Sequence, residues 1–143
     1  MVNFITANVS GLRNKRKRNT VFNWLKRKNC DIAVLQEVYC CENDILKWKI
    51  EWGGSIFANY GTNRSKGLLT LINPKYDTNG EQIFKDRDGR LLGVKVNINN
   101  ETVNIWNIYA PNITKNRKNY LDFLERTILE HGLIGHNNIR RGF

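Results

Sequence analysis

One short stretch, residues 31–38 (Asp-Ile-Ala-Val-Leu-Gln-Glu-Val), constrains the fold of this chain more than any other. Four consecutive apolar residues lie between a turn-like Asn-Cys-Asp and a polar pair, a pattern typical of a strand that is buried on both faces of an α/β sheet. Gln36 and Glu37 then fall at the carboxyl end of that strand, where open α/β sheets bind their ligands. Because a buried carboxylate needs a cation or a donor beside it, Glu37 is a candidate metal ligand. By position alone, a glutamate that reaches solvent at a strand end is the simpler interpretation.

The charge of the chain points to a polyanionic partner. Its 143 residues, the size of one ordinary domain, include 23 Lys and Arg against 13 Asp and Glu, a formal net charge of +10. Nucleic acid is the first expectation and an anionic membrane surface the second. No apolar run reaches membrane-spanning length, the N-terminus lacks the features of a signal peptide, and the three cysteines lack zinc-type spacing. We therefore expect an intracellular protein that is not secreted, for which a nuclear location fits.

The rest of the chain alternates short strand patterns with a few helical ones. Hydrophobic periodicity and turn residues predict strands at 2–8, 55–60, 67–72, 81–84, 91–98 and 102–109, and helices at 15–28, 42–49 and 114–131. The helix at 42–49 is expected to pack Ile45, Leu46 and Trp48 inward. No linker or repeat divides the chain, so these elements indicate a single α/β sandwich with a mixed sheet.

The helix predicted at 15–28 begins in the most basic part of the molecule. Its spacing predicts that Trp24 and Leu25 pack inward while the basic residues point to solvent. Eight cations precede the first acidic residue, which favours contacts with phosphates over a merely solvated face. The candidate nucleic-acid-binding residues are Arg13, Lys15, Arg16, Lys17 and Arg18.

Three predicted strands end in polar residues that have ordinary explanations when taken singly; Asn8, for example, could simply cap a turn. Together, Asn-Val-Ser-Gly-Leu from Asn8, Leu-Gln-Glu ending at Glu37, and Asn-Ile-Tyr-Ala-Pro-Asn ending at Asn112 form an ordered pattern. This pattern resembles the endonuclease/exonuclease/phosphatase superfamily. More narrowly, it is similar to the endonuclease domain of LINE-type (non-LTR) retrotransposons, which are relatives of the abasic-site endonucleases. The resemblance extends from Phe4 to about Ile134.

The resemblance implies a four-layer α/β sandwich that cuts phosphodiester bonds in DNA with Mg²⁺, for which Mn²⁺ could substitute. It implies that Glu37 is the metal ligand and that Asn8 helps to orient the metal site and the phosphate. It also implies that Tyr109 and Asn112 face the scissile phosphate. Mg²⁺ prefers few carboxylates together with water and phosphate oxygens, and hydrogen-bond donors stabilise the charge that develops in phosphoryl transfer.

The sequence also departs from the family pattern. Family members carry a Gly-Asp-x-Asn motif whose Asp activates the water, whereas the corresponding stretch here, 135–138, reads Gly-His-Asn-Asn. The residues after Leu133 could instead be unrelated to the family, and a later Ser-Asp-His motif has no counterpart. Ser10 stands where some repair enzymes of the family have an Asp. We therefore expect one incomplete four-layer α/β sandwich over residues 1–143, with uncovered inner sheet faces and with weak or no activity.

Two other functions stay open on the sequence. One is a nucleic-acid-binding module that keeps the basic face but has no catalysis. The other is a phosphatase of inositol lipids, or a sphingomyelinase, from the same superfamily. The first should bind DNA independently of divalent ions. The lipid-directed alternative is less well supported, because the sequence contains no membrane-inserting apolar hairpin. The sequence indicates no obligate protein partner.

Overall fold

The computed structural model describes residues 2–62, 64–76, 80–110 and 114–132. Its strands are β1 (Phe4–Asn8), β2 (Ile32–Gln36), β3 (Ser55–Asn59), β4 (Leu68–Ile72), β5 (Glu81–Lys85), β6 (Leu91–Ile98) and β7 (Glu101–Ile108). Its helices are α1 (Lys15–Arg27), the short 3-10 turn η1 (Glu42–Asp44), α2 (Ile45–Trp52) and α3 (Thr114–Gly132). These bounds agree with the predicted elements to within three residues, except that the single helix expected at 42–49 is divided into η1 and α2.

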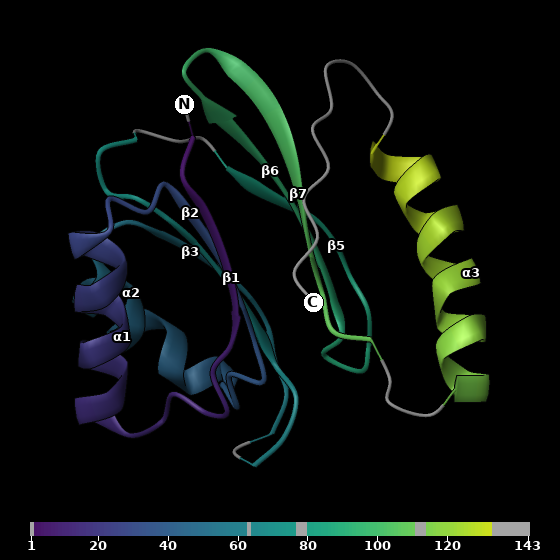
Figure 1. Ribbon diagram of the computed structural model, residues 1–143, viewed down its shortest axis with the longest axis horizontal. Coiled ribbons are helices and arrows are strands. Elements are labelled where there is room, and N and C mark those ends of the chain that lie inside the picture. The colour runs from purple at the N-terminus through teal and green to yellow at the C-terminus, as the bar shows by residue number, and fades with distance from the viewer. Residues whose placement is uncertain (1, 63, 77–79, 111–113, 133–143) are drawn as a thin grey trace.

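Two sheets lie face to face between layers of helix (Figure 1). The first sheet has the strand order β1-β2-β4-β3, with β1 parallel to β2 and the other pairs antiparallel, and the second is the antiparallel β5-β6-β7. Helices α1 and α2 cover the outer face of the first sheet, and α3 covers the outer face of the second. Three apolar clusters fill the three spaces between these layers. The predicted four-layer α/β arrangement is confirmed.

Strand β2 is buried on both faces, as its apolar run predicts. Because side chains alternate along a strand, Ala33 and Leu35 pack against α1 and α2, whereas Ile32 and Val34 pack against the second sheet. The two sheets cover each other, and the fully buried members of the layer between them include Leu68 and Leu92. The expectation of uncovered inner sheet faces is therefore wrong for the described residues.

Two predictions about the inward faces of the helices are also wrong. Trp24 is 41% exposed, because α1 turns Phe22 and Leu25 toward the sheet. Leu46 is 79% exposed, because α2 buries Trp48 and Trp52, which are four residues apart on one side of the helix. Phe22 and Leu25 therefore take the inner position in α1, and Trp48 and Trp52 take it in α2.

Among the helices that the structure describes, none combines the length and the apolar character needed to cross a bilayer.

Candidate active site

The predicted site residues Asn8 and Glu37 lie beside each other at the carboxyl ends of two parallel strands. Asn8 pairs with Gln36 in the sheet register, and the hydrogen bonds continue past the strand ends. The amide of Val9 donates to the carbonyl of Gln36 at 3.0 Å, and the amide of Gly11 donates to the carbonyl of Glu37 at 2.6 Å. Strand β7 ends at the same edge of the molecule (Figure 1). The structure thus brings three strand ends from two sheets together.

Tyr109, which follows β7, links the second sheet to Glu37. Its hydroxyl donates a short hydrogen bond to Oε1 of Glu37. This bond, together with partial burial and the negative charge of the carboxylate, raises the pKa of Tyr109, so the phenol stays protonated at neutral pH. A protonated phenol can donate to an anion, and a half-buried carboxylate can hold a cation. The pair is therefore suited to a phosphate and a metal ion.

Asn8, Gln36 and Tyr109 line one cavity of about 300 Å³, together with Thr6 and Arg117. The cavity opens at the edge where β1 and β7 end. The side-chain oxygen of Asn8 accepts from the amide of Ser10 at 3.1 Å, so this residue caps its own turn and also faces the cavity. The fourth predicted site residue, Asn112, lies outside the described residues.

The backbone around the site adopts left-handed conformations that residues other than glycine usually avoid. Left-handed φ values occur at Ser10 (+48°), Glu37 (+52°), Tyr39 (+59°) and Lys66 (+60°). The segments that carry them are joined, because the amide of Val38 donates to Gly67 at 3.0 Å and that of Tyr39 donates to Lys66 at 2.9 Å. Such conformations gather at functional sites, where the surrounding structure holds them. Sequence reasoning missed this cluster, although glycines at 11 and 67 mark two of its turns.

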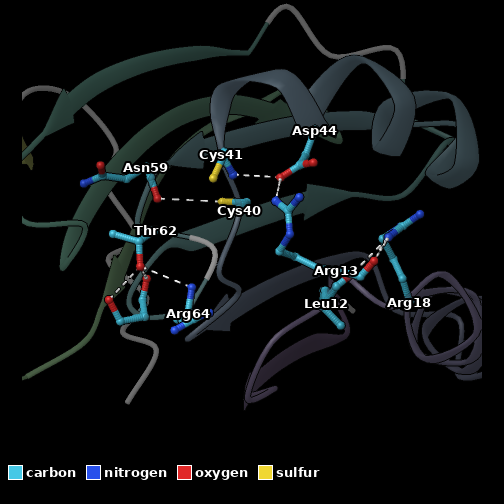
Figure 2. A network of polar contacts seen from close by, with 10 residues as sticks. Leu12, Arg13, Arg18, Cys40, Cys41, Asp44, Asn59, Thr62 and Arg64 are labelled. Carbon is cyan, nitrogen blue, oxygen red and sulfur yellow. Dashed lines mark hydrogen bonds and ion pairs between the residues drawn. The ribbon is translucent and has the colours of Figure 1, made fainter.

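Four of the five predicted nucleic-acid-binding residues are exposed and lie where α1 begins, next to the turn that follows β1. Nζ of Lys17 donates to the carbonyls of Val9 at 2.6 Å and Ser10 at 3.1 Å. The guanidinium of Arg13 pairs with Asp44 at 2.6 Å, as Figure 2 shows. Lys15 and Arg16 point to solvent beside them. The start of α1 therefore places positive charge next to the Asn8–Glu37 edge.

The prediction that Arg18 points outward to contact nucleic acid is wrong. Its side chain is 2% exposed, and its guanidinium binds both carboxylate oxygens of Glu51, at 2.7 and 3.0 Å. It also donates to the carbonyl of Leu12 at 2.9 Å and stacks on the ring of Trp48. Arg18 lies on the inward side of α1, so its charge ties α1 to α2.

Arg90 is a site residue that sequence reasoning missed. Its guanidinium lies over the ring of Tyr109, 5.4 Å from the centroid, and its carbonyl accepts from the amide of Tyr109 at 2.8 Å. Asp88 and Gly89 before it are residues typical of a tight turn, but nothing local shows that the next residue reaches Tyr109.

The residues present fit a Mg²⁺ ion. Among the described residues, no group of three or more His, Cys, Asp and Glu side chains could enclose a metal. Mg²⁺ does not need such a cage, because it commonly takes one or two carboxylates and completes its shell with water and phosphate oxygens. The carboxylate of Glu37, beside the cavity that Asn8 lines, offers that kind of partial site.

Comparison with known proteins agrees with this arrangement. The model of the Endonuclease/Exonuclease/phosphatase family matches residues 5–134. A protein described as "Transposon TX1 uncharacterized 149 kDa protein", from Xenopus laevis, is 29% identical over 119 residues, which are 83% of this chain and 9% of that protein. The endonuclease domain of TRAS1, a telomere-specific non-LTR retrotransposon, superposes with a TM-score of 0.66 at 14% identity, over 96% of this chain and 57% of that one. An AP endonuclease from Archaeoglobus fulgidus gives a TM-score of 0.59 at 17% identity, over 90% of this chain and 50% of that one.

The chain thus spans about half the length of these two solved structures and a small part of the transposon protein.

Proposed function

The chain belongs to the endonuclease/exonuclease/phosphatase family, and we propose that its Glu37 site serves a Mg²⁺-dependent DNA endonuclease of the retrotransposon type. One observation carries the proposal: the hydroxyl of Tyr109 binds the carboxylate of Glu37 across the two sheets, at a cavity that Asn8 lines. The exposed cations at the start of α1 lie next to it. The resemblance to a transposon protein and to a retrotransposon endonuclease supports DNA as the substrate.

Each residue has a role that its geometry permits. Glu37 would hold the ion, which when bound acts as a Lewis acid on a phosphate oxygen. Tyr109 keeps its proton at neutral pH. The hydroxyl has one proton to donate, so when an ion takes up the Glu37 carboxylate it would turn to the scissile phosphate and stabilise the charge that develops there. Asn8 would orient the phosphate from the end of β1, and the resemblance to the family suggests that Asn112 would also face the scissile phosphate.

We expect residues 1–143 to cut slowly when they are alone. The family motifs that carry the water-activating Asp and the later His have no match in the sequence. Loss of a general base typically lowers the rate about 10²–10⁴-fold. We therefore expect residues 1–143 to hold the metal site and the phosphate contacts. Full activity would need a domain as long as those of the solved relatives.

Nicking of supercoiled plasmid, at high protein concentration, tests the proposal. We expect slow conversion to open circles with Mg²⁺ or Mn²⁺ and none when EDTA removes the metal, because the phosphate charge then has no Lewis acid beside it. Equal nicking with and without metal would contradict the proposal. Absence of nicking, combined with DNA binding that is indifferent to Mg²⁺, would favour the non-catalytic binding module.

The two ends of α1 should contribute differently to DNA binding. Lys15 and Arg16 lie at the end next to the site, whereas Arg27 and Lys28 lie about 20 Å away along the helix. Replacing Lys15 and Arg16 by Ala should weaken binding and lower the slope of log affinity against log salt by about 0.9 for each DNA phosphate that the variant no longer neutralises.

The matched control replaces Arg27 and Lys28, which removes the same net charge from the far end. Fluorescence anisotropy with a labelled duplex measures both variants. Equal losses of affinity in both would show that binding follows net charge and not the position of the cations.

A further inference from the structure

A polar network crosses the otherwise apolar layer between the two sheets, directly behind the Glu37 site. Gln36 is 3% exposed and Asn107 is fully buried. Nε2 of Gln36 donates to Oδ1 of Asn107 at 3.0 Å and also lies 3.2 Å from the hydroxyl of Thr6. The network therefore joins β1 and β2 of the first sheet to β7 of the second.

Asn107 also reaches the middle of the first sheet. Its Nδ2 lies 3.2 Å from the carbonyl of Leu35 and 3.1 Å from that of Leu69, and 3.4 Å from the hydroxyl of Thr70. Most neighbouring residues in this layer are aliphatic. Aliphatic side chains at these positions would avoid the cost of burying two amides, since a buried amide is tolerated only where it is hydrogen-bonded. Stability alone does not require amides here.

Hydrogen bonds differ from apolar contacts because they have direction. The hydrophobic effect has no preferred direction of its own, whereas a bonded amide pair holds one relative position. Gln36 is joined by a peptide bond to Glu37, and Asn107 lies two residues before Tyr109, on the face of β7 that is turned to the first sheet. The bond between Tyr109 and Glu37 crosses the same two sheets at their edge. The amide pair is therefore placed to hold both partners of the site in register.

We propose that Gln36 and Asn107 are positioning residues that hold the Tyr109 hydroxyl against the Glu37 carboxylate by fixing one sheet on the other. Neither amide needs to touch substrate for this role. Its importance for reaction rests on the proposed function of the Glu37 site, where a displacement of about 1 Å can cost about 10²-fold in rate. The positioning itself is a property of the folded chain and can be measured without metal, DNA or turnover.

Carbon NMR of the chain labelled at tyrosine Cζ, at one fixed neutral pH, measures the Tyr109–Glu37 hydrogen bond. Tyr109→Phe identifies the resonance, and Glu37→Gln shows how far it moves when the carboxylate is lost. We expect Gln36→Met and Asn107→Leu to move the Tyr109 resonance by most of that displacement and in the same direction. Gln36→Met keeps the length of the side chain and leaves Asn107 bonded to backbone, so it tests the role even if Asn107→Leu does not fold.

Asn104→Leu is the matched control, because Asn104 is an equally buried amide on the same strand that faces α3 and donates to the carbonyl of His131. It should leave the Tyr109 resonance in place. A Tyr109 resonance unchanged in Gln36→Met, or in an Asn107→Leu variant that folds, would overturn the proposal. Failure of plasmid nicking would not affect this result, so the two proposals can fail separately.

Discussion

Glu37→Gln should abolish both Mg²⁺-dependent responses of this chain, the nicking of DNA and the gain in thermal stability. The amide keeps the size of the side chain and can still accept from Tyr109, but it has no charge to hold the ion. Removing a Lewis acid that contributes several kcal/mol should lower the nicking rate by roughly 10³-fold or more. Binding of DNA at the cations of α1 should change little, because those side chains are untouched.

Glu42→Gln provides the control for charge. Glu42 is an exposed carboxylate on η1, a few residues along the chain, and no contact joins it to Tyr109 in the described residues. The substitution removes the same charge near the same edge and should leave nicking unchanged. Equal losses of activity in Glu37→Gln and Glu42→Gln would show that the effect is one of general charge and would count against a metal site at Glu37.

Arg18→Met should destabilise the fold by about 3–5 kcal/mol, the range seen when one partner of a buried ion pair is removed. The substitution leaves Glu51 without the guanidinium that binds both of its oxygens, and it takes donors from the carbonyls of Leu12 and Arg13. For a domain stable by about 5–15 kcal/mol this is a large loss. Urea denaturation measures it.

Arg16→Met is the matched control, since Arg16 is exposed on the same helix and its replacement should change stability by no more than about 0.5 kcal/mol. The double variant Arg18→Met/Glu51→Met should recover part of the loss, because it leaves no unpaired charge behind. A double variant less stable than Arg18→Met would contradict this account of the pair.

The same pair makes stability depend on pH. Hydrogen bonds from Arg18 hold the pKa of Glu51 below its ordinary value. A carboxylate whose pKa is lower in the folded state adds stability above its unfolded pKa and loses it as the pH falls through the folded value. Stability should therefore decline below about pH 4.5, the ordinary pKa of a glutamate. Asp31, whose pKa is also lowered by Lys75, Asn3 and Tyr76 against the effect of burial, contributes in the same direction.

Much of the fold could be predicted because its strongest signals are local. The apolar run before Gln36 indicated a doubly buried strand, and the alternation along 91–98 and 102–109 indicated the hairpin of β6 and β7. Helix faces were less certain, since Trp24 and Leu25 are adjacent and cannot both occupy the centre of one inward stripe. Which of them packs depends on the neighbouring sheet, and that information is not local.

The candidate site shows the same division. The positions of Asn8 and Glu37 at strand ends could be predicted from turn residues and from apolar runs. The burial of Arg18 depends on Glu51, 33 residues away, and the link from Gln36 to Asn107 joins residues 71 apart. Tyr109 lies 72 residues from Glu37, and only the resemblance to a family placed the two together. Contacts between residues so far apart in the sequence form only when the two sheets pack together, so local patterns do not predict them.

A thermal melt of residues 1–143, with and without millimolar Mg²⁺, tests the central claim most directly. An ion that binds the folded chain and not the unfolded chain raises the free energy of unfolding by about 1.4 kcal/mol when its concentration is ten times the dissociation constant. We predict a cooperative transition that Mg²⁺ moves upward by a few degrees in the natural sequence and does not move in Glu37→Gln. A transition that is indifferent to Mg²⁺ in both proteins, or is raised equally in both, would contradict a metal site at Glu37.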